Sequence, residues 1–286
     1  MSKRKRRLIV YPTLAVTYFV AMVFGGCANK IILYPSTGPL PAQTAERRTV
    51  DLGDGRVVEC WVDRSPAAKR TGTPAAYSIE FTGNATRAEQ VASYSAHTWG
   101  ERAVEVWMVN YPGYGGSTGP AELERVAPAA VAVYDHVAKL ASQGAARRPI
   151  FTGGNSLGAA PALHVAVSRP VAGVVCQNPP ALRSMLLRQH GWYNLWLVAG
   201  PLAMAIPQEL DSTTAAAKIT APGVFLMAQG DQTVAPANQK VVVEAYNGPK
   251  RIVSFAGGHN DPLTDATAVE VQRALDWLWA QAGLTK

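Results

Sequence analysis

From about residue 50 onward, short apolar runs alternate with longer segments whose apolar residues recur at helical spacing. The runs are nearly continuous and rich in β-branched residues, as expected of strands covered on both faces. We predict these strands at residues 75–81, 103–109, 149–152, 171–177, 222–228 and 250–255. Helical patterns lie at residues 87–101, 121–141, 157–168, 237–246 and 265–282. This alternation predicts an α/β fold: a mostly parallel central sheet with helices on both faces, begun by an antiparallel edge hairpin at residues 56–62.

One segment breaks the alternation. Residues 179–212 lie between two predicted strands, and we expect them to form a small cap over the C-terminal ends of the strands. The cap holds many large apolar side chains: Trp192, Tyr193, Leu195, Trp196, Leu197, Val198, Met204 and Ile206. Two interpretations stay open, because these side chains can pack the cap onto the body or line an acyl pocket.

The N-terminus has the layout of an export signal. Five consecutive basic residues, Lys3 to Arg7, precede an apolar run over residues 8–24, and Gly25 and Gly26 lead to Cys27. The end of this segment resembles a bacterial lipoprotein signal, in which the cysteine becomes lipidated. An uncleaved anchor is the alternative, although the run is short for a span and Pro12 interrupts it. A buried core helix is the third interpretation.

Either form of membrane attachment predicts the same location. A basic segment stays in the cytoplasm, so we expect residues 28–286, the single folded domain, to lie on the extracytoplasmic side, in the cell envelope. Residues 1–27 are the export signal or anchor. The remaining cysteines, Cys60 and Cys176, lie in predicted strands, and we expect them to be free and buried.

The charge distribution argues against nucleic acid as a partner. The net charge is +7, but the five basic residues of the N-terminal segment account for most of it and leave only +2 on the rest of the chain. A nearly neutral body has no electrostatic reason to bind nucleic acid.

The strongest chemical signal is the G-N-S-L-G run at residues 154–158. It follows a predicted strand and precedes a helix of small residues, the context that a G-x-S-x-G nucleophile elbow requires. Gly154 and Gly158 leave room for the tight turn. Ser156 is the candidate nucleophile, and the backbone N–H of Leu157 is placed to stabilise an oxyanion.

On these residues, the chain resembles the α/β-hydrolase superfamily. Residues 110–117, N-Y-P-G-Y-G-G-S, are similar to the superfamily's loop after its fourth strand. Residues 81–85, F-T-G-N-A, take the place of its H-G-N loop, with Thr82 where histidine is usual. The resemblance implies that the backbone N–H of Asn84 is the second oxyanion donor.

Two further loops complete the resemblance in the chain order that the fold requires, serine, then acid, then histidine. Residues 229–236, Q-G-D-Q-T-V-A-P, are similar to the acid loop and nominate Asp231. Residues 256–259, A-G-G-H, are similar to the histidine loop and nominate His259 as general base. Both follow predicted strands, at the edge where open α/β sheets bind ligands.

Other candidates have weaker support. His97, His136 and His164 lie in helical patterns, while His190 lies in the cap. Asp261 and Asp265 follow His259 closely and are expected to support its loop, and Asp211 ends the cap. The chain lacks a dinucleotide fingerprint, a Walker motif and zinc-ligand spacing, so the sequence implies no cofactor and no metal.

The sequence therefore predicts a membrane-tethered serine hydrolase that cleaves a carboxylic ester through an acyl-enzyme, with a small or lipid-like acyl ester as substrate. A serine peptidase, thioesterase or acyltransferase would use the same residues. A non-catalytic envelope lipoprotein that keeps the fold as a scaffold is the alternative from another class.

Overall fold

The computed structural model describes residues 3–144, 146–192, 194 and 196–285, with the backbone alone for residues 3–9, 189 and 190. An eight-stranded sheet runs through the body in the order β1-β2-β4-β3-β5-β6-β7-β8. The first strand pairs antiparallel with the second, and the second antiparallel with β4. All the other pairs are parallel. The strands are β1 (Glu46–Asp51), β2 (Val57–Arg64), β3 (Ala76–Phe81), β4 (Val104–Val109), β5 (Ile150–Asn155), β6 (Gly173–Gln177), β7 (Gly223–Ala228) and β8 (Lys250–Phe255).

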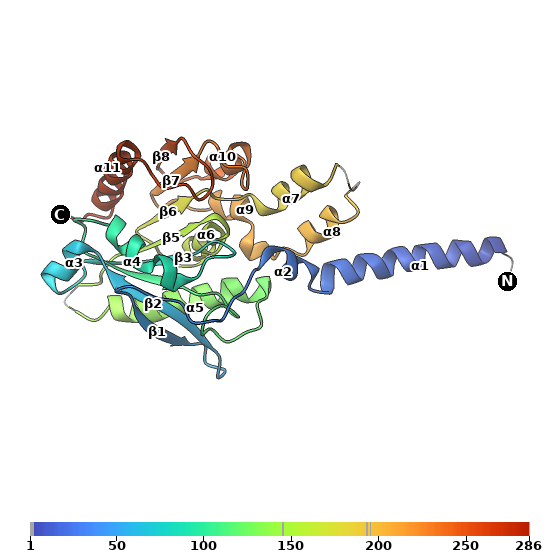
Figure 1. The fold of residues 1–286 in the computed structure, drawn as a ribbon, viewed down its shortest axis with the longest axis horizontal. Coiled ribbons are helices and arrows are strands. Elements are labelled where there is room, and N and C mark those ends of the chain that lie inside the picture. Colours follow the sequence, from blue (N-terminus) through green and yellow to red (C-terminus); the bar gives the residue numbers. More distant parts are fainter. Residues whose placement is uncertain (1–2, 145, 193, 195, 286) are drawn as a thin grey trace.

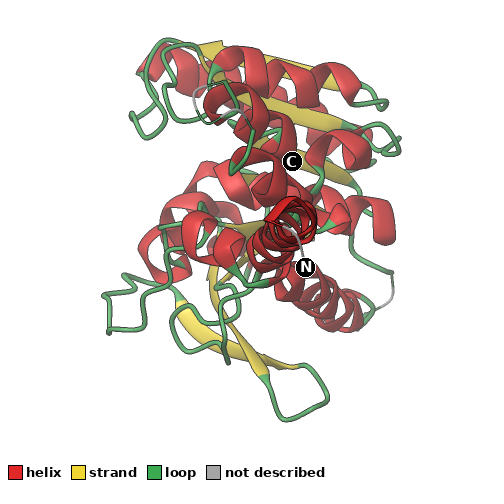
Figure 2. Ribbon diagram, turned by 90° about the vertical axis from the view of Figure 1, so that its right-hand side faces the viewer, coloured by secondary structure: helices red, strands yellow, loops and turns green. Residues whose placement is uncertain are grey.

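This is the α/β-hydrolase fold, as the sequence predicts. Helices α5 (Leu123–Ala141), α6 (Ala159–Ser168) and α10 (Pro236–Ala245) cover one face of the sheet, and α4 (Ala88–Thr98) and α11 (Asp265–Gln281) cover the other (Figures 1 and 2). Shorter helices join these layers. They are α3 (Pro66–Thr71), α9 (Ser212–Ala216) and the 3-10 turns Ser156–Gly158 and Gln208–Leu210.

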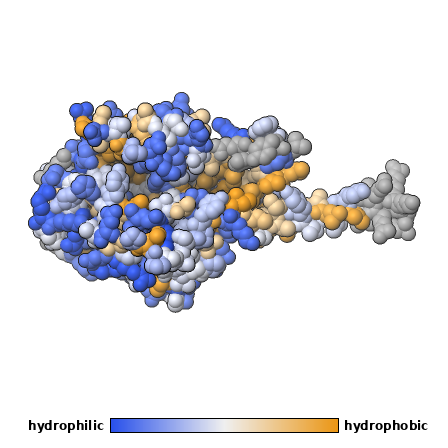
Figure 3. All heavy atoms as spheres, viewed as in Figure 1, coloured by the Kyte–Doolittle hydropathy of each residue, from blue (hydrophilic) through white to orange (hydrophobic). Residues whose placement is uncertain are grey.

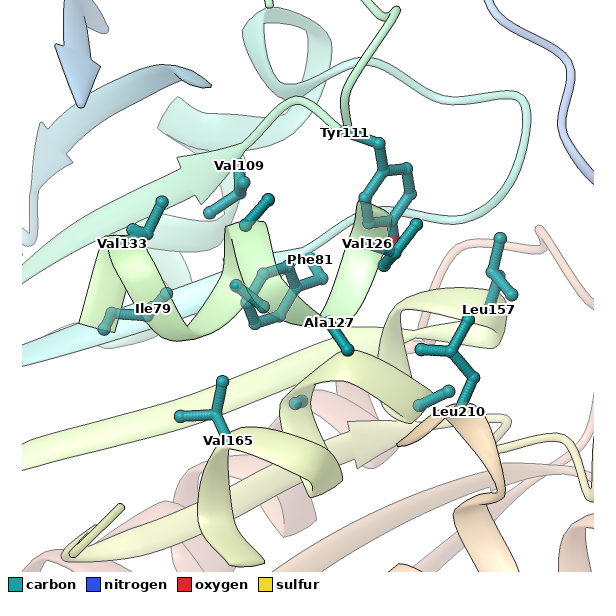
Figure 4. Packing of buried hydrophobic residues seen from close by; sticks show 14 of the residues in the cluster. Ile79, Phe81, Val109, Tyr111, Val126, Ala127, Val133, Leu157, Val165 and Leu210 are labelled. Carbon is teal, nitrogen blue, oxygen red and sulfur yellow. The ribbon is translucent and has the colours of Figure 1, made fainter. Parts of the chain in front are cut away.

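The two faces of β3 pack into different layers because successive side chains of a strand point to opposite sides. Ile79 and Phe81 contribute to the core beneath α5 and α6 (Figure 4). Leu157, in the turn after β5, belongs to the same core and is buried. The buried side chain of Leu157 therefore anchors the turn that carries the candidate nucleophile, Ser156.

The predicted cap segment forms α7 (Leu182–His190) and α8 (Ala199–Met204). Its buried side chains Leu182, Leu186, Leu202 and Ile206 join the core of the body, which accounts for how the cap is held. Four other large apolar side chains of the cap point outward and are more than half exposed: Trp192, Trp196, Leu197 and Met204. Val198 is partly buried and packs against the core. Tyr193 and Leu195 lie outside the described residues.

The N-terminal segment forms a projecting helix, α1 (Lys3–Phe24), followed by α2 (Cys27–Ile32) (Figure 1). Helix α1 packs beside α8, and the Tyr18 hydroxyl donates to the carbonyl of Leu197 at 3.0 Å. No helix among the described residues is long and apolar enough to cross a membrane. Residues after α1 belong to the body, since Ala28 and Leu33 are buried in its core.

Candidate active site

Ser156 stands at a strained turn between β5 and α6. Its φ is 53°, in the left-handed region that residues with a side chain rarely adopt. The turn is possible because its neighbours lack side chains: a Cβ on Gly154 would overlap the carbonyl of Gly158, and one on Gly158 would overlap the carbonyl of Phe81. This is the backbone geometry of a nucleophile elbow, and it presents the serine at the C-terminal edge of the sheet.

Asp231 and His259 meet although 28 positions separate them in the chain. Nδ1 of His259 lies 2.6 Å from Oδ2 of Asp231. The Asp231 carboxylate is buried, and its Oδ1 accepts the backbone N–H groups of Thr233 and Val234, each at 2.8 Å. These donors hold the carboxylate toward the imidazole, so Asp231 can orient the ring and stabilise its protonated form.

Gln239 is a positioning residue that the sequence analysis missed. From the first turns of α10, its Nε2 donates to Oδ2 of Asp231 at 3.0 Å and to the carbonyl of Val234 at 2.7 Å. Gln239 is fully buried. A glutamine inside a helix carries no motif, so only the folded arrangement reveals this contact.

Asn178 connects the strand ends behind the histidine loop. It follows β6, and its side chain accepts the N–H of Ala228 at 3.0 Å and donates to the carbonyl of His259 at 3.2 Å. Its φ of 48° is again left-handed, a conformation that asparagine tolerates better than most residues. This side chain therefore ties the ends of β6 and β7 to the loop that carries the imidazole.

The loop after β3 approaches the elbow from the other side. A Cβ on Gly83 would lie 3.7 Å from Cβ of Ser156. Thr82, where the resemblance leads one to expect histidine, donates its hydroxyl to the carbonyl of Thr86 at 2.8 Å. The threonine side chain therefore bonds within its own loop, and with threonine in place of histidine Gly83 still lies next to Ser156.

The two tyrosines of the N-Y-P-G-Y-G-G-S loop hold that neighbouring loop in place. The hydroxyl of Tyr111 donates to the carbonyl of Thr82 and that of Tyr114 to the carbonyl of Asn84, each at 2.6 Å. Burial raises the pKa of Tyr114 to about 12, so its hydroxyl stays protonated and able to donate at physiological pH. The motif thus fixes the backbone on both sides of Gly83.

A buried polar network supports the tyrosine loop in turn. Oε2 of Glu59 accepts the N–H of Gly116 at 2.8 Å and the side-chain amide of Asn110 at 2.7 Å, and Arg47 pairs with the other oxygen. A Cβ on Gly115 would overlap the Glu59 carboxylate, and the residue has a φ of 53°. Glycine is therefore required where this loop passes the carboxylate.

A cavity of about 440 Å³ opens beside the elbow. Gly83, Asn155 and His259 line it, so the loop after β3, the residue before Ser156 and the histidine border one space. Although both residues are described, no hydrogen bond joins the side chains of Ser156 and His259, and catalytic hydrogen bonds often tighten only when substrate binds. No residue of the predicted cap is among the described residues that line this cavity.

The remaining candidates lie outside this arrangement. His97, His136 and His164 lie on α4, α5 and α6, and the His190 side chain lies outside the described residues. Asp261 supports the histidine loop by accepting the N–H of Gly258 at 2.7 Å, and Asp211 caps α9. Cys60 and Cys176 are free and buried, as the sequence predicts. No group of three metal-ligating side chains occurs within the described part of the chain.

Fold and site together define the class: an α/β-hydrolase fold with a nucleophile elbow and a buried Asp–His pair at one edge of the sheet. By structure, the chain is similar to Est1E from Butyrivibrio proteoclasticus, with a TM-score of 0.64, 16% identity, and coverage of 83% of this chain and 99% of that one. It is also similar to the esterase Pf2001 of Pyrococcus furiosus, with a TM-score of 0.64, 12% identity, and coverage of 88% and 97%.

By sequence, the chain is similar to the uncharacterized protein Rv2307c of Mycobacterium tuberculosis, with 29% identity over 273 residues and 92% of each chain covered. No protein-family model matches it.

Proposed function

We propose that the protein is a serine hydrolase that cleaves a carboxylic ester through an acyl-enzyme. The observation that carries this proposal is the Asp231–His259 hydrogen bond beside a serine held at φ 53°. Neither a strained serine nor a buried carboxylate oriented on an imidazole benefits stability, since both cost free energy. Their coincidence at one edge of the sheet supports catalysis over a scaffold.

In the proposed reaction, His259 takes the proton of Ser156 as its oxygen attacks the ester carbonyl. Asp231 holds the imidazole in the tautomer that this transfer needs. Backbone N–H groups of Leu157 and Asn84 stabilise the oxyanion. The C–O bond to the alcohol then breaks, and His259 protonates the departing oxygen. Water, deprotonated by His259, attacks the acyl-enzyme carbonyl, and the bond to the serine oxygen breaks. His259 returns the proton to that oxygen, which releases the acid and the free serine.

Fluorophosphonate labelling of the full-length protein in detergent, with peptide mapping, tests the nucleophile. We expect one adduct, on Ser156, and none in Ser156→Ala. Ser212→Ala is a matched control, because Ser212 is a buried serine of α9 that does not line the cavity. An unlabelled, folded wild-type protein would favour the scaffold alternative. Turnover of matched ester, thioester and amide substrates separates the hydrolase classes.

We also propose that the protein is tethered to the extracytoplasmic face of a membrane through residues 1–27. Helix α1 exposes many apolar side chains, including Tyr11, Leu14, Val16 and Phe24, which is unfavourable in water (Figure 3). The exposed Trp196, Leu197 and Met204 of the cap continue this apolar surface, since α1 packs beside α8.

The segment that directly follows the tether contacts a loop of the candidate site. The chain leaving α2 passes the loop after β3, where Nδ2 of Asn84 donates to the carbonyl of Ile32 at 3.0 Å and the N–H of Tyr34 donates to the Tyr114 hydroxyl at 2.9 Å. Membrane attachment would therefore hold the site near the lipid surface, which supports an apolar or lipid-derived ester as substrate. Turnover of p-nitrophenyl esters should rise from acetate to octanoate.

Vesicle flotation tests the membrane proposal. We expect the full-length protein to float with vesicles of phosphatidylglycerol and phosphatidylcholine, and Leu197→Glu/Met204→Glu to bind more weakly. The matched control is Ile252→Glu/Val269→Glu, since both residues are half exposed on the body. Equal flotation of both double variants would show that the cap takes no part. Intact mass after extraction then distinguishes a lipidated Cys27 from an uncleaved anchor.

A further inference from the structure

The cavity beside the elbow is mostly apolar but carries two carboxylates. Its walls include Trp99, Met108, Leu226 and Leu275. Glu80 from β3 and Asp261 from the histidine loop also line it. Among the described lining residues there is no lysine or arginine. The space next to the proposed nucleophile is therefore both apolar and negatively charged.

Glu80 is held firmly without being neutralised. Its Oε1 accepts the hydroxyl of Ser78 at 2.8 Å and the indole N–H of Trp99 at 3.0 Å, and its Oε2 accepts the hydroxyl of Ser95. All three donors are uncharged. They fix the carboxylate in one orientation and leave its full negative charge facing the cavity. An apolar side chain at this strand position would pack at lower cost.

Asp261 adds a second negative charge near the mouth. Its Oδ2 accepts the N–H of Gly258, and its side chain is exposed. Neither Glu80 nor Asp261 pairs with a cationic side chain among the described residues, whereas most other carboxylates of the body do, as Asp63 does with Lys69. The missing counter-charge is what a cationic substrate group would supply.

We propose that this cavity is the substrate pocket and that it selects esters carrying a protonated amine. The ammonium group pairs with Glu80, Asp261 raises the local negative potential, and the apolar part of the substrate packs on the remaining walls. This inference rests on the proposed hydrolase function. It narrows the substrate class from apolar esters to apolar esters with an ammonium group.

Glu80→Gln removes the charge and keeps the shape. The glutamine oxygen can accept from Ser78 and Trp99, and its NH₂ can donate to the hydroxyl of Ser95. The measurement is the ratio of kcat/KM for p-nitrophenyl 6-aminohexanoate to kcat/KM for its neutral counterpart, p-nitrophenyl heptanoate, with full-length protein. We expect this ratio to fall by about 10–100-fold in Glu80→Gln, the range of a lost charge-assisted hydrogen bond.

A control variant at an exposed carboxylate and a second variant in the cavity complete the test. Glu244→Gln neutralises an exposed carboxylate on α10, and its ratio should equal that of the wild type. Asp261→Asn keeps an oxygen for the N–H of Gly258 and lies on an exposed loop, so it should fold even if Glu80→Gln does not. We expect a smaller fall, of about 2–5-fold, because its charge is more screened by water.

Binding of hexylammonium, measured by calorimetry against 1-hexanol, separates this inference from the proposed function because it needs no turnover. If Ser156 is labelled but the ratio of the two kcat/KM values is equal in wild type and Glu80→Gln, the cationic pocket is overturned and the proposed hydrolase function is kept. Glu80-dependent hexylammonium binding without labelling of Ser156 supports the pocket and overturns the hydrolase. Equal hexylammonium binding by wild type and Glu80→Gln also overturns the pocket.

Discussion

The hydroxyl of Tyr114 donates to the carbonyl of Asn84 at 2.6 Å, so a motif tyrosine of one loop fixes the backbone of the loop that faces Ser156. Tyr111 holds the carbonyl of Thr82 in the same way, and each planar peptide group also fixes the N–H of the following residue, Gly83 or Ala85. The two bonds therefore hold the peptide planes on either side of the one that carries the Asn84 N–H. Prearranged N–H donors are what oxyanion stabilisation requires. The tyrosine loop therefore contributes to the candidate site through the backbone it positions.

Tyr114→Phe should lower kcat/KM for a p-nitrophenyl ester by about 10-fold. This is less than the roughly 10²–10³-fold loss on removing an oxyanion donor, because the variant loosens the loop but keeps the N–H groups. The effect should lie in kcat, because the oxyanion forms only after binding. Tyr246→Phe is the control: this buried tyrosine donates to the carbonyl of Ala221 at 2.9 Å, away from the site. Equal losses in both variants would assign Tyr114 to stability alone.

Asp231→Asn should lower kcat by about 10⁴-fold, since an asparagine favours the wrong imidazole tautomer. Steady-state kinetics at saturating ester measure this loss, and circular dichroism confirms the fold. Asp211→Asn provides the comparison, because Asp211 caps α9 and makes no contact with His259. If Asp231→Asn kept wild-type turnover, the acid of the site would have to be sought elsewhere.

Gly158→Ala should abolish fluorophosphonate labelling and destabilise the protein by about 1–3 kcal/mol or more, because the new methyl group would overlap the backbone of Phe81. Gly38→Ala should be tolerated, since a Cβ there meets nothing within 4 Å. Urea unfolding of the two variants beside wild type makes the comparison. A stable, labelled Gly158→Ala protein would contradict the elbow geometry.

Glu59 should make folding sensitive to acid. Burial alone would raise its pKa, but hydrogen bonds from Gly116 and Asn110 and the charge of Arg47 outweigh it and hold the pKa below the ordinary value of 4.5. A carboxyl whose folded-state pKa is lowered stabilises the fold above its unfolded pKa. That contribution is lost as the pH falls below 4.5 and through the folded-state pKa.

Urea unfolding at pH 7 and pH 3 checks this expectation. The free energy of unfolding of wild type should fall by about 1–2 kcal/mol more than that of Glu59→Gln over this interval, the scale of hydrogen bonds to a charged group. Glu46→Gln, which removes an exposed carboxylate paired with Arg48, should follow wild type. Identical acid losses in wild type and Glu59→Gln would contradict the role of this network.

The apolar pattern predicted six of the eight strands closely, because buried parallel strands must be apolar on both faces. It missed β1, whose side chains are polar and exposed at the sheet edge except for Val50. It also ended β5 at residue 152, whereas the strand continues through Gly153 and Gly154 to Asn155. Glycine has a low strand propensity, so the local sequence does not predict a strand there. The strand forms because Gly153 pairs with Val175 of the neighbouring strand β6.

What the sequence by itself determined is the fold class and the nomination of Ser156, Asp231 and His259, since each follows a strand in a short motif whose chemistry is local. Only the tertiary structure decided which side chains complete the site. Gln239 on Asp231, Tyr114 on Asn84 and the uncompensated Glu80 are contacts between distant segments. No periodicity or spacing encodes them, because they depend on how the strand ends, loops and helices meet around the sheet.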